Sequence, residues 1–142
     1  MPSLWHNVLF ILVVAIMSCR PKGKSTFPDT PSHADFEVAV EDECFIIRLV
    51  EPHRITEARR IVEQRKAVFP IGRIRRGNGG FNQCGGRTWS WHIDPTSVEF
   101  AEMAIEACDA RPSYVEDNLQ TWTEQVGNYC PWGGRLVREI PR

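Results

Sequence analysis

Two neighbouring stretches of the chain alternate or concentrate apolar residues with the period of a β-strand. Residues 36–40 (FEVAV) alternate, which indicates a strand with one buried face. Residues 44–50 (CFIIRLV) form a β-branched apolar run and predict a second, more deeply buried strand. The acidic triplet 41–43 lies between them, and we interpret it as a solvated hairpin turn in preference to a cation site.

Two later stretches have helical spacing. Pro52 suits the first position of a helix that we expect to run to about residue 67, with its basic residues facing outward. The second predicted helix covers residues 113–127, begins with the capping box SYVE and ends at Gly127. Its apolar positions recur at intervals of about one helical turn: Val115, Leu119, Trp122 and Val126.

Further strands are predicted at residues 71–75, 87–93 and 136–140. In the second of these, Trp89, Trp91 and Ile93 share one face, while Ser90 and His92 share the other.

Residues 98–108 fit either a strand or a helix capped by Asp94. We favour the strand, which puts four apolar residues on one face: Ala101, Met103, Ile105 and Ala107. The sum is an α+β fold, with a mostly antiparallel sheet of five or six strands and two helices.

The amino-terminal segment has a different composition. The first charged side chain is Arg20, and residues 8–17 form an apolar run that is shorter than the ~20 residues of a membrane span. We therefore expect a signal peptide over residues 1–18, a flexible leader over 19–34 and one domain over 35–142. Lipidation of Cys19 is a less favoured alternative. The protein is expected to be secreted and extracellular, with no membrane span.

Five cysteines change the picture of the fold. If Cys19 lies at the cleavage site, the domain keeps four, and an even number in a small exported domain indicates two disulfides. Four cysteines allow three pairings, of which we expect Cys108–Cys130 and Cys44–Cys84. A zinc site is disfavoured, because the chain has no C-x-x-C or H-x-x-H spacing.

Charge is segregated although the net charge is only −1, which gives no general attraction to nucleic acid. Residues 48–87 hold ten Arg or Lys against three Glu, and residues 94–124 hold eight acids against Arg111. The basic segment predicts a face for an anionic polysaccharide or an acidic extracellular protein. Its candidate ligand-binding residues are Arg73, Arg75, Arg76 and Arg87. The commoner outcome for such segregation is pairing of the two segments inside the domain.

Other chemistry is weakly indicated. Trp89, Trp91, Trp122 and Trp132 could stack on sugar rings, although core packing is the commoner role. His92, Asp94 and Cys84 resemble a nucleophilic site only in residue type, and no catalytic motif accompanies them. No cofactor or metal site is indicated. The glycine-rich loop 77–86 is not a phosphate loop, since no Gly-Lys-Ser/Thr follows it.

Several blocks together carry a family resemblance. They are FIIRLVEPHRITEARRIV (45–62), IGRI (71–74), WSWHIDP (89–95), AIEACDA (104–110), YVEDNL (114–119), YCPW (129–132) and LVREI (136–140). In this combination the chain resembles, over residues 35–140, the N-terminal domain of a slime-mould calmodulin-binding protein, which also occurs as stand-alone exported proteins. The family pattern has cysteines matching Cys108 and Cys130, which supports that pairing. Cys44 and Cys84 depart from the pattern and fit an additional disulfide.

The resemblance supplies no catalytic residues, and calmodulin binding is not expected of an exported chain. We therefore expect a secreted, non-enzymatic binding or matrix-type protein. The alternative is a protease-inhibitor-like or toxin-like effector that presents loop 77–86. A third hypothesis is a hydrolase that uses His92 with an acid.

Overall fold

The computed structural model describes residues 32–142. The predicted signal peptide, Cys19 and the predicted leader up to residue 31 lie outside the described residues. The first strand begins at Ala34, where the leader was expected to end, and the Ala34 side chain is buried. No helix among the described residues is long and apolar enough to cross a membrane.

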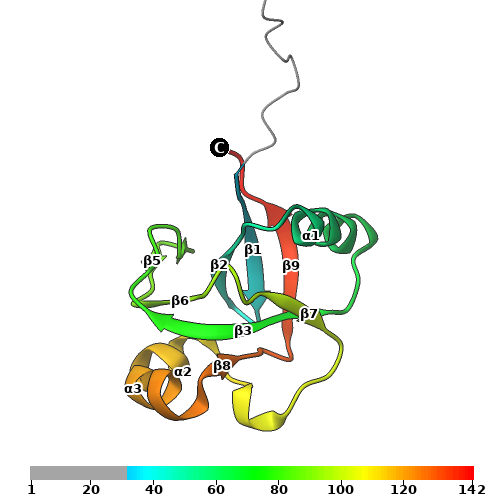
Figure 1. The fold of residues 1–142 in the computed structure, drawn as a ribbon. Coiled ribbons are helices and arrows are strands. Elements are labelled where there is room, and N and C mark those ends of the chain that lie inside the picture. Colours follow the sequence, from blue (N-terminus) through cyan, green and yellow to red (C-terminus); the bar gives the residue numbers. More distant parts are fainter. Residues whose placement is uncertain (1–31) are drawn as a thin grey trace, which may run out of the picture. The chain divides into compact units, whose positions relative to one another are not determined.

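The first sheet contains three antiparallel strands in the order β2-β1-β9 (Figure 1). They are β1 (Ala34–Val40), β2 (Glu43–Leu49) and β9 (Gly134–Glu139). Every second residue of β1 is buried, as expected for a strand with one face on the core. Strand β9 pairs with β1 alone, and the register shifts between Glu37 and Val38 so that Val137 forms a bulge.

The second sheet is organised by the long strand β3 (Phe69–Arg76). Along its length β3 pairs in turn with β7 (Glu99–Ala101), β8 (Asn128–Tyr129) and β6 (Trp91–Ile93), always antiparallel. A separate small hairpin joins β4 (Gln83–Cys84) to β5 (Arg87–Thr88). The α+β class and the antiparallel pairing are confirmed, although the strands form three sheets and several are very short.

Helix α1 (Pro52–Gln64) begins at Pro52 as predicted and buries Ile55, Ala58 and Ile61. It ends at Arg65, which is left-handed with φ 51. That conformation normally favours glycine, because a Cβ atom crowds the following carbonyl.

The second predicted helix is interrupted. It consists of α2 (Pro112–Asp117), α3 (Leu119–Thr121) and a π-helical turn η2 (Trp122–Val126) that ends at Gly127. The expected capping box does not form, because the helix starts one residue earlier. The backbone N–H of Ser113 donates instead to the Glu43 carboxylate, and Glu116 accepts from the Ser90 N–H.

The core lies between the two sheets and helix α1. Trp89, Trp91 and Ile93 are all buried, which confirms their predicted face. Four aromatic rings meet there in a chain of contacts, and the Trp91 and Tyr129 centroids lie 5.2 Å apart. The other members of this cluster are Phe45 and Trp122. Burial raises the pKa of the Tyr129 phenol well above its usual value, so the group stays neutral.

The strand expected over residues 98–108 is wrong beyond Ala101. Strand β7 ends there, since its partner β3 begins at Phe69 and offers no further backbone. Residues 102–105 form a loop that leads into a short 3-10 helix, η1 (Glu106–Cys108). In consequence Met103 and Ile105 are exposed, not part of an apolar strand face.

Both predicted disulfides are present. Cys44–Cys84 anchors the β4–β5 hairpin to β2, and Cys108–Cys130 joins η1 to the residue after β8. They close loops of 40 and 22 residues in sequence separation. In the chain-entropy model, loops of these lengths each contribute about 3–4 kcal/mol to stability.

Candidate functional site

The arginines predicted to bind a ligand all carry ion pairs within the domain. Arg73 and Arg75 share one partner, with guanidinium nitrogens 3.4 and 3.2 Å from an Asp94 carboxylate oxygen. Arg76 pairs with Glu124 at 3.3 Å. The basic and acidic segments therefore neutralise each other here, which is the commoner of the two outcomes considered for their segregation.

Asp94 is the centre of this arrangement. Partial burial acts to raise its pKa, but hydrogen bonds from the Thr96 side chain and backbone, and from Arg75, outweigh burial and hold the pKa below its usual value. The carboxylate is therefore ionised throughout the neutral range, and the neighbouring arginines stay matched to it.

Arg87 belongs to a different cluster. It lies 3.7 Å from Glu43, which also pairs with Arg111, and Arg111 contacts Glu41 and Asp42 in addition. Three acids surround two arginines, so this part of the surface is not a net cation site. The Arg87 guanidinium also stacks on the Trp89 ring, 5.2 Å from its centroid.

A pocket between α1 and β9 holds the free positive charge instead. Its volume is about 360 Å³, and its cations are Arg65, Lys66 and Arg135. Three aliphatic side chains complete the lining: Val62, Leu136 and Val137. We call these six residues the basic pocket.

Both walls of the basic pocket follow from local structure. Arg65 and Lys66 lie where α1 ends, with Arg65 bonded through its backbone N–H to the last helical carbonyls. The partial negative charge of a helix carboxyl end favours cations at these positions. Arg135 lies on β9 beside the buried Leu136 and the bulged Val137, and bulges commonly redirect side chains.

The cations of the basic pocket are unpaired. Within residues 32–142, no ion pair includes Arg65, Lys66 or Arg135, and no carboxylate lines the pocket. An anion that enters therefore meets three cations without displacing a resident partner.

The sequence identified only part of this pocket. Arg65 was assigned to a basic face and Lys66 to the outer side of the first helix, but nothing in the sequence linked them to Arg135. Arg135 lies 69 residues beyond Lys66 in the chain. The available signal is the alternation of exposed and buried residues in the closing strand, which indicates an outward Arg135 but not its neighbours.

The predicted aromatic platform for sugars is not formed. Trp89, Trp91 and Trp122 are buried in the core, and only Trp132 of the four is exposed. The expected core role of Trp122 is confirmed.

The residues of the hydrolase hypothesis serve separate purposes. His92 Nδ1 donates to the Gly77 carbonyl at 2.7 Å, Asp94 binds the arginines of β3, and Cys84 is oxidised in its disulfide. Glu37 lies close to Cys44 and Cys84, but the two sulfur atoms are bonded to each other and offer no thiolate to a metal.

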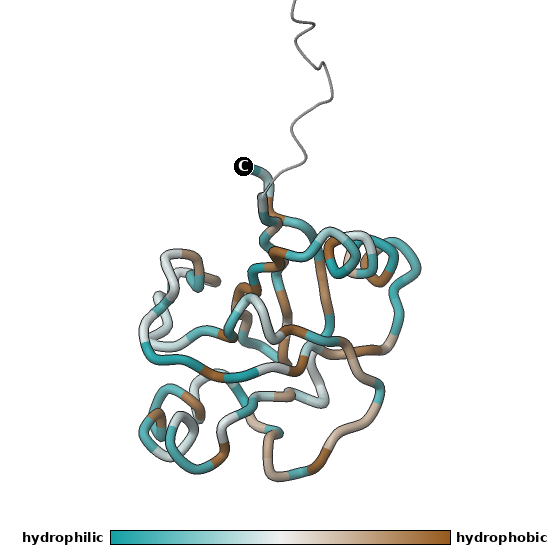
Figure 2. The backbone as a smooth tube through the Cα atoms, viewed as in Figure 1, coloured by the Kyte–Doolittle hydropathy of each residue, from teal (hydrophilic) through white to brown (hydrophobic). Residues whose placement is uncertain are grey.

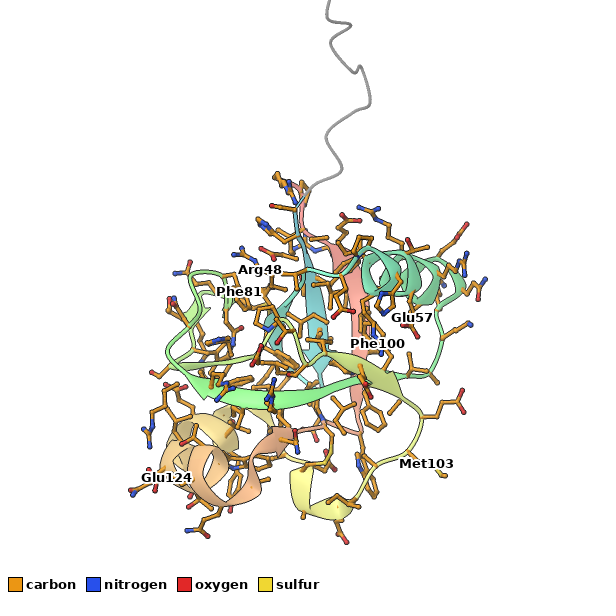
Figure 3. All side chains as sticks on the ribbon, viewed as in Figure 1. Arg48, Glu57, Phe81, Phe100, Met103 and Glu124 are labelled. Carbon is orange, nitrogen blue, oxygen red and sulfur yellow. A yellow bond between two sulfur atoms is a disulfide. The ribbon has the colours of Figure 1, made fainter. Side chains whose placement is uncertain are left out.

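Loop 77–86 is anchored at several points. Asn82 is fully buried, accepts from the Ile46 N–H and donates to the Trp91 carbonyl, each at 2.8 Å. Phe81 lies under the Arg48 guanidinium, 4.6 Å from the ring centroid (Figure 3). Its largest side chains thus contact the domain, and glycine backbone forms much of its outer surface. The inhibitor-like or toxin-like role of this loop stays a prediction.

Comparison with known proteins gives one family. Residues 32–142 match the family model for the N-terminal domain of the calmodulin-binding protein, which confirms the resemblance indicated by the motifs. No curated protein and no solved structure matches the chain.

Proposed function

The chain belongs to the family of the calmodulin-binding protein's N-terminal domain, and we propose that it is an exported, non-enzymatic binding module that holds an anionic polysaccharide in its basic pocket. The observation that carries this proposal is the presence of three unpaired cations in one open hollow. The proposal keeps the expected class of partner and changes the residues that meet it.

The difference between free and paired cations decides which region binds. A sulfate or carboxylate that approaches Arg73 or Arg75 competes with Asp94, which lies only 16% exposed between them. In the basic pocket an incoming anion gains the attraction of all three cations without such a cost. Both regions are screened by salt, so binding through either weakens as ionic strength rises.

The aliphatic lining suits a sugar more than a bare ion. Leu136 is buried, while Val137 is 42% exposed, so the pocket presents apolar surface beside its charges. A sugar ring offers C–H faces to such a lining and carries its anionic groups at the edge. The low-dielectric floor also strengthens the charge interactions above it.

The backbone at Arg65 gives independent support. A non-glycine residue in the left-handed region costs stability, and such departures are found where function selects the side chain. A glycine at the end of α1 would relax the helix terminus but would remove one of the three cations.

Export is supported by the two disulfides. Structural disulfides in a small domain are typical of oxidising compartments. Expression of the full chain in a secreting host, followed by intact mass of the protein from the medium before and after reduction, tests this part. We expect cleavage near residue 18 and a mass gain corresponding to two reduced bonds; an uncleaved chain with free thiols would contradict it.

Binding is tested on immobilised heparin, with uncharged agarose as the control. We expect retention on heparin at low salt, elution as salt is raised and no retention on agarose. Soluble polyglutamate serves as a competitor that carries charge without sugar rings. Failure to be retained on heparin, or equal elution by polyglutamate and by soluble heparin at matched charge, would count against a polysaccharide ligand.

A further inference from the structure

A larger groove lies on the neighbouring surface, between α1 and β7. Its volume is about 700 Å³, and Ile61, Val68 and Phe100 form its apolar part. The charged side chains along it include Arg60, Lys66 and Glu102.

The loop that follows β7 starts at the edge of this groove and carries exposed apolar residues. Met103 is 87% exposed and Ile105 is 73% exposed, the highest values among the large apolar side chains of the described residues. In Figure 2 this loop includes a strongly hydrophobic stretch, and Figure 3 shows Met103 pointing away from the fold. Exposed apolar clusters of this kind mark contacts with other macromolecules.

The loop is anchored, so its exposure is a defined feature of the surface. The Ile105 carbonyl accepts from the Cys108 N–H at 3.3 Å, and Cys108 is joined to Cys130 by the disulfide. Pre-organisation of this kind lowers the entropy cost of binding.

Charges of both signs are left unmatched beside the groove. Within residues 32–142, none of the ion pairs includes Arg60, Lys66 or Glu102, although Glu57 on the same groove is paired with Arg54. A partner that satisfies this surface must offer a carboxylate to the cations and a cation to Glu102.

A second copy of the chain meets all of these requirements. A two-fold axis relates identical patches, so that residue i contacts residue j of the partner and the reverse. Here the protruding tip and the receptive groove are adjacent, because Glu102 belongs to the groove and Met103 follows it in the chain. We propose that two copies associate through this face, with Met103 of each in the apolar groove of the other and Glu102 opposite the other copy's Arg60 and Lys66.

Sedimentation velocity of the protein purified after expression of the full chain tests this association without any polyanion present. From about 1 µM to 1 mM we expect a monomer–dimer equilibrium. Met103→Ser should weaken the dimer at least about tenfold, since truncation of a central apolar contact has that effect. The matched control is Tyr114→Ser, which removes another exposed large side chain, on α2, and should leave the equilibrium unchanged.

Charge exchange separates a specific interface from general adhesion of apolar surface. Lys66→Glu and Glu102→Lys should each weaken the dimer, and the double variant, or a mixture of the two single variants, should restore it. A monomer at every concentration, a dimer insensitive to Met103→Ser, or failure of the exchange to restore association would overturn the proposal. Heparin retention is measured separately, so either proposal can fail while the other stands.

Discussion

Two basic regions of this domain share residue types but differ in the state of their charges. On β3, Arg73, Arg75 and Arg76 each have a carboxylate partner, whereas the three cations of the basic pocket have none among the described residues. The number of basic residues in a segment therefore says where positive charge lies but not whether it is available. Availability depends on the acids that the fold brings alongside.

Register explains the difference. Ile74 pairs with Ile93 across β3 and β6, which brings the following residue, Asp94, beside Arg73 and Arg75. Strand β9 is instead the outer strand of its sheet next to α1, and the acids that it offers are used elsewhere. Glu139, for example, binds Arg59, and that hydrogen bond lowers the pKa of the Glu139 carboxyl.

The largest effect that separates the two regions is on stability. Asp94→Ala should lower the free energy of unfolding by about 1–3 kcal/mol, because it removes charge-assisted bonds from Arg75 and Thr96 that organise the turn after β6. Urea denaturation followed by tryptophan fluorescence measures it. Alanine at Arg135, an exposed site without an ion pair, is the matched control and should change stability by less than about 0.5 kcal/mol. Equal losses in both variants would remove the distinction between the regions.

A second prediction opposes stability and binding at a single residue. Arg65→Gly should stabilise the domain by about 0.5–1 kcal/mol, because glycine adopts φ 51 without the crowding of a Cβ atom. It should also elute from heparin at lower salt than the wild type.

Arg65→Ala is the control for this effect. It removes the same charge but keeps the Cβ atom, so it should lose retention without gaining stability. Unchanged retention in both variants would exclude Arg65 from the binding surface.

The smallest effect is a pH dependence. The pKa of Asp94 is lower in the folded state than its ordinary value, so its ionisation stabilises the fold above the ordinary pKa, and that contribution is lost as pH falls through the folded pKa. The stability difference between the wild type and Asp94→Asn should therefore be constant from about pH 5 to 7 and shrink below about pH 4. A difference that persists undiminished at pH 2 would contradict a charge-based role for Asp94.

Local patterns were sufficient for much of the fold. Alternation located β1, the first-position proline located the start of α1, and the cysteine count gave two disulfides. They failed where tertiary partners decide the outcome. Residues 102–105 have the composition of a strand, but β3 provides no backbone beside them. The expected capping box at Ser113 is replaced by Glu43, which comes from the β1–β2 hairpin 70 residues earlier in the chain.

The candidate site was less accessible to sequence reasoning for the same reason. Arg73, Arg75 and Arg76 form the densest basic cluster in the chain, which drew attention to β3, yet their partners are remote in sequence. The basic pocket joins a helix end to a strand near the carboxyl terminus, and no local pattern records that proximity. Arg65 at a helix terminus that favours glycine is the one local irregularity that points to the pocket.

The most direct test compares two triple variants on immobilised heparin. One replaces Arg65, Lys66 and Arg135 with alanine, and the other replaces Arg73, Arg75 and Arg76, so both remove three positive charges. If free cations bind the polyanion, the first variant elutes at much lower salt than the wild type, while the second elutes near the wild type. The reverse order, or equal shifts in both variants, would contradict the central claim.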